Sequence, residues 1–269
     1  MPATDLLRAG HAKEALAQLE AEVRKEPSNV NHRVFLFQLL SILGAWERAA
    51  TQLDVVGQID AKALPMVQTY QTALSCELLR NRVFEGEKSP LIFGDPEDWI
   101  AHLLEALRLT ASGNHAEAER MRMSALDRAP ATPGQIDGKD FEWIADADSR
   151  MGPVCEAILN GKYYWIPFHR LQSVEVEPPA DLRDFVWIPA KLTFANGGES
   201  VALLPTRYPG SETHADDMIR TARRTDWRQV SEGTFLGVGQ RMYATDAGEY
   251  ALMDIRSIQL RRGDVSAAA

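Results

Sequence analysis

The densest group of residues that could carry out chemistry is the run Asp146-Ala147-Asp148-Ser149-Arg150. Two carboxylates this close could ligate a divalent cation or act as an acid–base pair, as in a metal-dependent hydrolase. A calcium-binding loop would need Gly at its sixth position and an acid at its twelfth, where this chain has Met151 and Ala157. On a helix, Asp146 and Arg150 would lie four residues apart and could pair. The run therefore favours a structural salt-bridge cluster near a domain junction over a metal-dependent enzyme.

Other catalytic and metal-binding patterns are missing from the sequence. The six histidines show no HxH or HxxxH spacing, and Ser211 does not lie in a GxSxG motif. Gly237-Val238-Gly239 lacks the third glycine of a dinucleotide-binding loop. Cys76 and Cys155 are far apart, which predicts two reduced, buried thiols in helical segments of a cytoplasmic protein rather than a zinc site. We therefore expect a protein that is not an enzyme, with no catalytic residues, metal or cofactor.

Two clusters could instead contact a partner. The segment 163–168 carries four aromatic residues, and alternate residues of a strand face opposite sides. Half of these rings are expected in a core and the others against neighbouring helices, with a recognition surface as the alternative. The stretch 220–228 holds four arginines and Trp227, and it could bind an acidic peptide or a phosphate. Pairing of these arginines with Asp216 and Asp217 on an exposed helix is the favoured interpretation.

Bulk composition excludes several functional classes. The net charge of -9 argues against a general nucleic-acid binder, which would normally be basic. No apolar run is long enough to span a bilayer, so we expect no membrane insertion. The first five residues lack a basic region followed by an apolar core, so no secretory signal is expected. A hydrophobic content of 45% is ample for real cores.

A short pattern in the first half indicates how the chain is organised. It repeats after 34 residues, as Gly10, Ala15 and Leu19 and then as Gly44, Ala49 and Leu53. A weaker third copy contains Leu109, Gly113 and Ala118. Glycine at a helix–helix turn and alanine inside the following helix are typical of tetratricopeptide-like (TPR-like) repeats. Stacked helix pairs form grooves, so this pattern predicts a binding protein with helices over residues 4–128.

The composition changes near residues 129–134, where we place a domain boundary. This divides the chain into a TPR-like helical repeat domain, 1–130, and a helix-plus-antiparallel-β domain, 131–269. Residues 141–160 still look helical, whereas later segments are short, aromatic and β-branched, as strands prefer. Asn196-Gly197-Gly198 and residues 245–248 are hairpin signals, and 217–224 fits a short helix. The fold class is α+β, with a small barrel or a curved sheet in the second half.

Several stretches spread over the chain allow a comparison with known families. In the first half they are residues 33–40 (RVFLFQLL) and 63–70 (ALPMVQTY). In the second half they are 141–150 (FEWIADADSR), 163–168 (YYWIPF), 196–199 (NGGE), 205–211 (PTRYPGS), 239–246 (GQRMYATD) and 248–250 (GEY). This combination resembles the ImpE family, also called TagJ-like, from about Leu6 to Leu260. Members of that family are accessory components of bacterial type VI secretion systems.

The resemblance implies a cytoplasmic, non-enzymatic protein that associates with a contractile sheath. Such a protein would bind a helical segment of the small sheath subunit and assist the sheath cycle with the AAA+ ATPase that dismantles contracted sheaths. The repeats independently favour a groove that accepts an amphipathic helix. We expect this groove near Phe35, Phe37, Gln38 and Tyr70, although Phe35 and Phe37 could simply belong to the core between helices.

A second hypothesis places recognition in the β half. Arg207, Tyr208 and the basic stretch 220–228 would then contact another secretion component, and the helical repeats would act as a scaffold. A third hypothesis, much more remote, is a metal-dependent hydrolase that uses Asp146 and Asp148.

Overall fold

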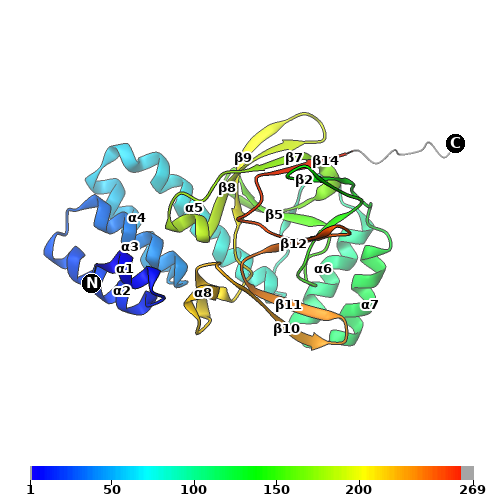
Figure 1. Cartoon of the computed structure of the whole chain (residues 1–269), viewed down its shortest axis with the longest axis horizontal. Helices are drawn as coiled ribbons and strands as arrows, with labels where there is room; N and C mark the ends of the chain where they lie inside the picture. The colour runs from blue at the N-terminus through cyan, green and yellow to red at the C-terminus, as the bar shows by residue number, and fades with distance from the viewer. Residues whose placement is uncertain (1, 262–269) are drawn as a thin grey trace.

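Helices fill the first half of the chain and strands dominate the second (Figure 1). The computed structural model describes residues 2–261. The fold is therefore α+β, as expected. Among the described helices, none is both long and apolar enough to cross a membrane.

The helical part begins with antiparallel pairs joined by glycine turns. Its helices are α1 (Ala3–Arg8), α2 (Ala12–Lys25), α3 (Val30–Ile42), α4 (Trp46–Ile59), α5 (Leu64–Phe84), α6 (Asp98–Ala111) and α7 (His115–Leu126). Gly10, Gly44 and Gly113 end the turns before α2, α4 and α7 with φ of 81°, 69° and 79°. Because L-residues avoid this backbone conformation, the repeated glycines are explained by the turns that they permit. The TPR-like assignment of the whole array stays a prediction.

A nine-stranded sheet forms most of the second half. Its order is β1-β6-β5-β9-β8-β7-β14-β2-β3, and every pairing is antiparallel except that of β1 with β6. The strands are β1 (Leu91–Ile92), β2 (Gly134–Ile136), β3 (Lys139–Phe141), β5 (Val154–Leu159), β6 (Lys162–Pro167), β7 (Leu171–Val176), β8 (Trp187–Phe194), β9 (Glu199–Pro205) and β14 (Ser257–Leu260). In the described range no pairing joins β1 to β3, so the sheet has two ends.

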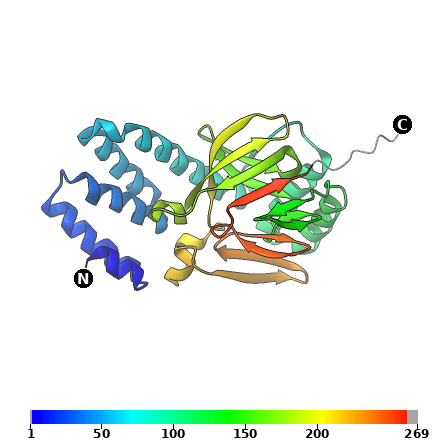
Figure 2. The same ribbon diagram turned by 45° about the horizontal axis from the view of Figure 1, so that its top comes forward.

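Two smaller sheets and short helices complete this half. The first small sheet contains β4 (Ile144–Asp146), β12 (Met242–Thr245) and β13 (Gly248–Ala251). The second is a two-stranded ribbon of β10 (Thr225–Ser231) and β11 (Thr234–Gly239), at the lower edge of the molecule in Figures 1 and 2. Both predicted hairpin turns are confirmed, between β8 and β9 and between β12 and β13. The predicted short helix is α8 (Asp217–Arg220).

The helical prediction for residues 141–160 is wrong, because this segment contributes strands β3, β4 and β5. All six residues of β5 are buried. A short apolar run covered on both faces has no strand alternation, so its period cannot distinguish it from a helix. The signal that could have decided the matter is Asn160-Gly161, both with positive φ, the turn that joins β5 to β6. Cys155 accordingly lies in a strand.

Helices and sheet share one hydrophobic core. The largest buried cluster contains residues of α1–α7 together with residues of β5, β6, β8 and β9. Trp187 of β8 packs its ring 6.1 Å from that of Trp46 and 5.9 Å from that of Tyr70. In strand β6, Trp165 faces this cluster, while Ile166 faces a second cluster inside the sheet. Figure 2 shows the blue helices joined to the strands through α5 and the green segment beside it. The division at residue 130 into two domains stays a prediction.

The two repeat glycines differ in their surroundings, which gives a matched test. An alanine at either position must adopt a positive φ, which costs about 1–2 kcal/mol. A Cβ on Gly10 would meet no atom within 4 Å, whereas one on Gly44 would lie 2.5 Å from Cγ of Glu212. We expect Gly44→Ala to lower the free energy of unfolding more than Gly10→Ala does, in urea titrations. Equal losses would show that the contact with Glu212 contributes nothing.

Candidate functional site

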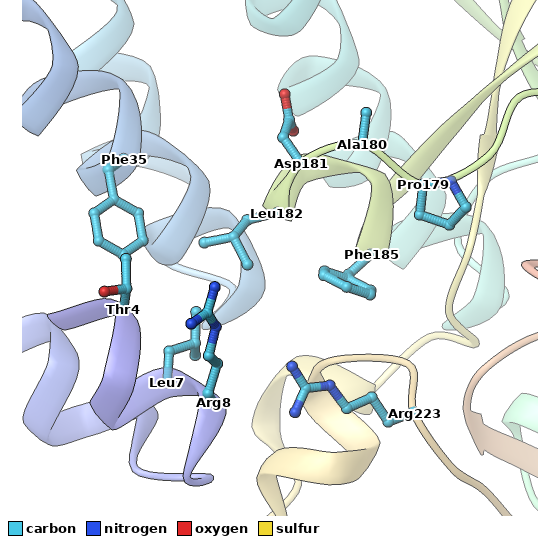
Figure 3. Close-up of a pocket in the computed structure, with 10 residues that line it drawn as sticks. All are labelled: Thr4, Leu7, Arg8, Phe35, Pro179, Ala180, Asp181, Leu182, Phe185 and Arg223. Atoms are coloured by element: carbon cyan, nitrogen blue, oxygen red, sulfur yellow. The ribbon is translucent and has the colours of Figure 1, made fainter.

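A groove opens where the first helices meet the sheet. We call it the helix–sheet groove; it has a volume of about 320 Å³ and its main lining residues are Leu7, Arg8, Phe35, Leu182, Phe185 and Arg223. Figure 3 shows Leu7 and Arg8 from α1, Phe35 from α3, Leu182 and Phe185 from a green turn, and Arg223 from the segment after α8. Segments far apart in the sequence therefore build one apolar cleft.

The turn that carries Leu182 and Phe185 is held by its own polar groups. It is the 3-10 helix η3 (Leu182–Phe185), and Asp181 accepts a hydrogen bond from the Arg183 backbone N–H at 3.0 Å. The side chain of Asp184 accepts in return from the Asp181 N–H at 2.9 Å, so the two residues form a capping box. The capping box fixes the N-terminal end of η3, from which Leu182 and Phe185 line the groove.

Two arginines stand at the mouth of the helix–sheet groove (Figure 3). The side chain of Arg8 is 80% exposed, and its nearest carboxylate, that of Asp5, lies 4.0 Å away. The guanidinium of Arg223 lies 5.9 Å from the centre of the Phe185 ring. The one acid in the lining, Asp181, is paired with Arg183 at 2.7 Å. The groove is thus apolar inside with positive charge at its rim.

Of the six residues predicted to bind a partner, Phe35 lines this groove. Phe37, Gln38 and Tyr70 are buried and do not belong to its lining. The rings of Phe37 and Tyr70 lie 5.6 Å apart, and burial raises the pKa of Tyr70 to about 12. Arg183 of η3 lies 4.7 Å above the Tyr70 ring. Tyr70 thus packs against η3, and the contact of these three residues with a partner stays a prediction.

Arg207 and Tyr208, the other two predicted residues, are buried as well. Arg207 donates to the carbonyl oxygens of Ser41 and Ile42 at 3.2 and 2.7 Å. These are end carbonyls of α3, which lack partners within the helix, so Arg207 completes that helix terminus. Burial lowers the pKa of Arg207 to about 10. Tyr208 donates to Asp146 at 3.0 Å. Both side chains therefore donate hydrogen bonds to other groups of the chain itself, and their contact with a partner stays a prediction.

The basic stretch 220–228 is partly paired with Asp216 and Asp217, as expected, but Arg220 lies in α8 and is buried rather than on an exposed helix face. Arg220 pairs with Asp217 at 2.5 Å, and Arg224 pairs with Asp216 at 2.9 Å. Asp217 also accepts from the backbone N–H of Ala12 at 2.6 Å, at the start of α2. This stretch therefore joins the strand half to the first helices.

A buried ionic network lies between α5 and the sheet. It contains three acids and two arginines: Glu77, Arg80, Glu156, Arg241 and Asp146. Glu156 of β5 accepts from Arg80 of α5 at 2.5 and 3.1 Å, and from Arg241. Arg80 also donates to Glu77 at 3.3 Å, and Arg241 also pairs with Asp146. Each charge therefore has an opposite partner, which buried ions need.

The network shifts the pKa values of its acids in opposite directions. Burial alone would raise the pKa of Glu156, but Arg80 and Arg241 outweigh it and hold the value at about 2. Burial raises the pKa of Asp146 to about 6, although Arg241 opposes the rise. Burial also raises the pKa of Glu77. The central carboxylate is thus the most firmly ionised of the three.

The predicted pairing of Asp146 with Arg150 is wrong, because neither residue lies on a helix. Arg150 instead binds Asp148, with its Nε 2.8 Å from Oδ1 and its Nη2 2.5 Å from Oδ2. The interpretation of the run as a structural salt-bridge cluster agrees with this geometry. Across residues 2–261, no group of three His, Cys, Asp or Glu side chains could hold a metal ion.

Sequence reasoning missed the central residues of the network. Arg80, Glu156 and Arg241 are separated by 76 and 85 positions, so no local motif connects them. One available signal was the lone acid inside the apolar run of β5. A charge in a fully buried strand must have a partner, although the sequence does not say which residue it is.

Comparison with known proteins decides the family. A family model described as ImpE protein matches residues 138–259. The type VI secretion system accessory component TagJ of Pseudomonas aeruginosa is 53% identical over 98% of this chain and 92% of its own length. The chain belongs to the ImpE/TagJ family. The solved structure of protein VPA1032 from Vibrio parahaemolyticus matches it with a TM-score of 0.89 at 21% identity, over 97% of this chain and 98% of that one. At that identity, the likeness shows that the two share a fold.

The network of this ImpE/TagJ family member predicts a strong effect of one substitution. Glu156→Gln leaves Arg80 and Arg241 without the carboxylate between them, and breaking a buried ion pair costs about 3–5 kcal/mol. We expect a loss of this size in the free energy of unfolding, measured in urea at pH 7. The matched control is Glu105→Gln, which removes an exposed pair with Arg108 and should have a far smaller effect.

The same variant has a defined pH dependence. Because the folded-state pKa of Glu156 is about 2, below its ordinary 4.5, its stabilisation is complete above pH 4.5 and is lost as the pH falls towards 2. The difference between wild type and Glu156→Gln should therefore be constant above pH 4.5 and shrink below it. A difference that grows on acidification would contradict this assignment.

Proposed function

We propose that this protein is a non-enzymatic accessory component of a bacterial type VI secretion system. In this proposal it acts in the cytoplasm, binds a helical segment of the small sheath subunit, and assists the sheath cycle with the AAA+ ATPase. The observation that carries the proposal is 53% identity to TagJ over nearly the whole chain, since that relative is an accessory component of such a system. The family match to residues 138–259 supports it.

The helix–sheet groove is our proposed site for the sheath segment. An amphipathic helix buries apolar side chains spaced by three or four residues when it lies in a groove. Leu182, Phe185 and Phe35 supply apolar surface for such a helix, and Arg8 and Arg223 supply charge for acids beside it. The stacked helices next to the groove are consistent with TPR-like repeats.

A non-enzymatic role agrees with the burial and pairing of Asp146 and Asp148, the two acids of the hydrolase hypothesis. Asp146 and Asp148 are buried, and both bind guanidinium groups of the chain itself. A carboxylate closed off by internal partners cannot reach a substrate in this conformation. The remote hydrolase hypothesis therefore has no support from the geometry.

A titration of a labelled peptide tests the proposal. The amino-terminal helix of the small sheath subunit should bind the full-length protein saturably in fluorescence anisotropy. Phe35→Ala and Arg223→Gln should each raise Kd about tenfold, because one removes apolar contact and the other removes an exposed charge partner. Phe235→Ala is the matched control, since Phe235 is 41% exposed on the distant ribbon.

Each outcome of this titration decides a different point. An unchanged urea midpoint in Arg223→Gln would show that its weaker binding is not a folding defect. Loss of binding in Phe235→Ala with normal binding in Phe35→Ala would move recognition to the β half. No binding by the folded wild-type protein would refute recognition of this helix.

A further inference from the structure

A second cavity lies between the β10–β11 ribbon and the loop before α8. We call it the ribbon pocket; it has a volume of about 460 Å³, and its lining includes Arg150, His214, Trp227, Arg228, Leu236 and Val238. This volume is in the usual range of small-molecule sites. The lining combines apolar side chains with a few polar groups, as such sites do. None of these residues lines the helix–sheet groove.

Three nitrogen donors of residues that line the ribbon pocket have no acceptor among the described residues. Arg150 uses Nε and Nη2 on Asp148 and on the carbonyl of Gly237, which leaves its Nη1 free. The guanidinium of Arg228 makes no hydrogen bond or ion pair within residues 2–261. Nδ1 of His214 accepts from the Asp216 N–H at 3.1 Å, so the ring proton of the neutral form is on Nε2. Nε2 has no described acceptor.

The nearby carboxylates are already engaged. Asp148 accepts at Oδ1 from the Arg150 backbone N–H at 2.8 Å and at Oδ2 from the Gly237 N–H at 2.7 Å, in addition to the Arg150 side chain. Asp226 pairs with Arg224 at 2.9 Å. Free donors in the pocket therefore exceed free acceptors, which favours an anionic ligand group such as a carboxylate or a phosphate.

Trp227 adds a flat aromatic wall. Trp227 is 37% exposed as a residue, and its indole lies 5.6 Å from the ring of Tyr208. Gly237 allows this packing, because a Cβ there would lie 3.0 Å from Trp227 Cζ3 and would collide with Tyr208. The indole is thus supported on one side by a buried ring, and it can stack a planar group on its exposed side.

We propose that the ribbon pocket binds a small organic anion whose carboxylate or phosphate is attached to a flat ring. Arg150 and His214 would hold the anionic group, and Trp227 would stack the ring; Arg228 follows Trp227 in β10, so its side chain points to the opposite face of the ribbon. Asp148 fixes the guanidinium plane of Arg150, whose Nη1 has no acceptor among the described residues. This site is independent of the proposed sheath contact, so either can fail without the other.

Calorimetric titration of the full-length protein tests the proposal with three probes: AMP, benzoate and inorganic phosphate. AMP, benzoate or both should bind saturably, and phosphate should bind at least tenfold more weakly, because it has no ring. Binding of AMP alone would identify a phosphate ligand, and binding of benzoate alone a carboxylate ligand. No heat with either ring-bearing probe would overturn the proposal.

Two variants and a control locate the binding. His214→Ala removes a donor of the pocket lining and should weaken binding of the ring-bearing probe about tenfold. Trp227→Leu should weaken that probe but leave the affinity for phosphate unchanged. Arg8→Gln, an exposed arginine of the helix–sheet groove, should bind as the wild type does. Equal affinity in all three variants would show that the probe binds elsewhere and would refute the site.

Discussion

The carboxylate of Glu156 is the point at which the helices and the sheet are joined. It receives Arg80 from α5 on one side and Arg241, next to β12, on the other. An ion buried without a partner would cost several kcal/mol, so all three residues must arrive together. Arg80 also donates to the Arg207 carbonyl at 2.8 Å, and Trp187 donates to Glu77 at 2.8 Å. This cluster holds α5 on the sheet, and the contacts of Arg207 with α3 and of Asp217 with α2 join the earlier helices to the strand half.

The helix–sheet groove is a result of that arrangement. Its walls come from α1, α3, η3 and the segment after α8, and no two of these are neighbours in the sequence. The packing of Phe37, Tyr70 and Trp187 holds α3 against α5 and against β8, the strand that follows η3. A partner that enters the groove therefore meets a surface formed jointly by the repeats and by the strand half. Arg223, from the basic stretch of the second hypothesis, lines this groove together with Phe35 of the first, whereas Arg207 and Tyr208 are buried.

Local sequence patterns predicted the helices and turns of this fold better than the contacts between elements that are distant in the sequence. The glycine repeat, both hairpin turns and α8 depend on backbone preferences within a few residues, and the structure confirms them. Strand β5 was missed because burial on both faces removes the alternation by which strands are recognised. The ionic network joins residues from Glu77 to Arg241 that are far apart in the sequence, and no local sequence pattern predicts such pairings. The helical repeat pattern predicted a groove near Phe35. The opposite wall of the observed groove is η3, a segment for which no sequence motif predicted a contact.

The contact of Arg207 with the end of α3 has a consequence for how the chain is made. A ribosome completes α3 long before it adds residue 207, and during that interval the carbonyls of Ser41 and Ile42 have no arginine to accept from. The ring of Trp46 likewise has no packing partner until Trp187 has been added to the chain. The nascent helices thus expose apolar surface until most of the chain has been synthesised, which is the situation in which growing chains aggregate or require chaperones. Final packing of the first helices is therefore a late event in the biosynthesis of this protein.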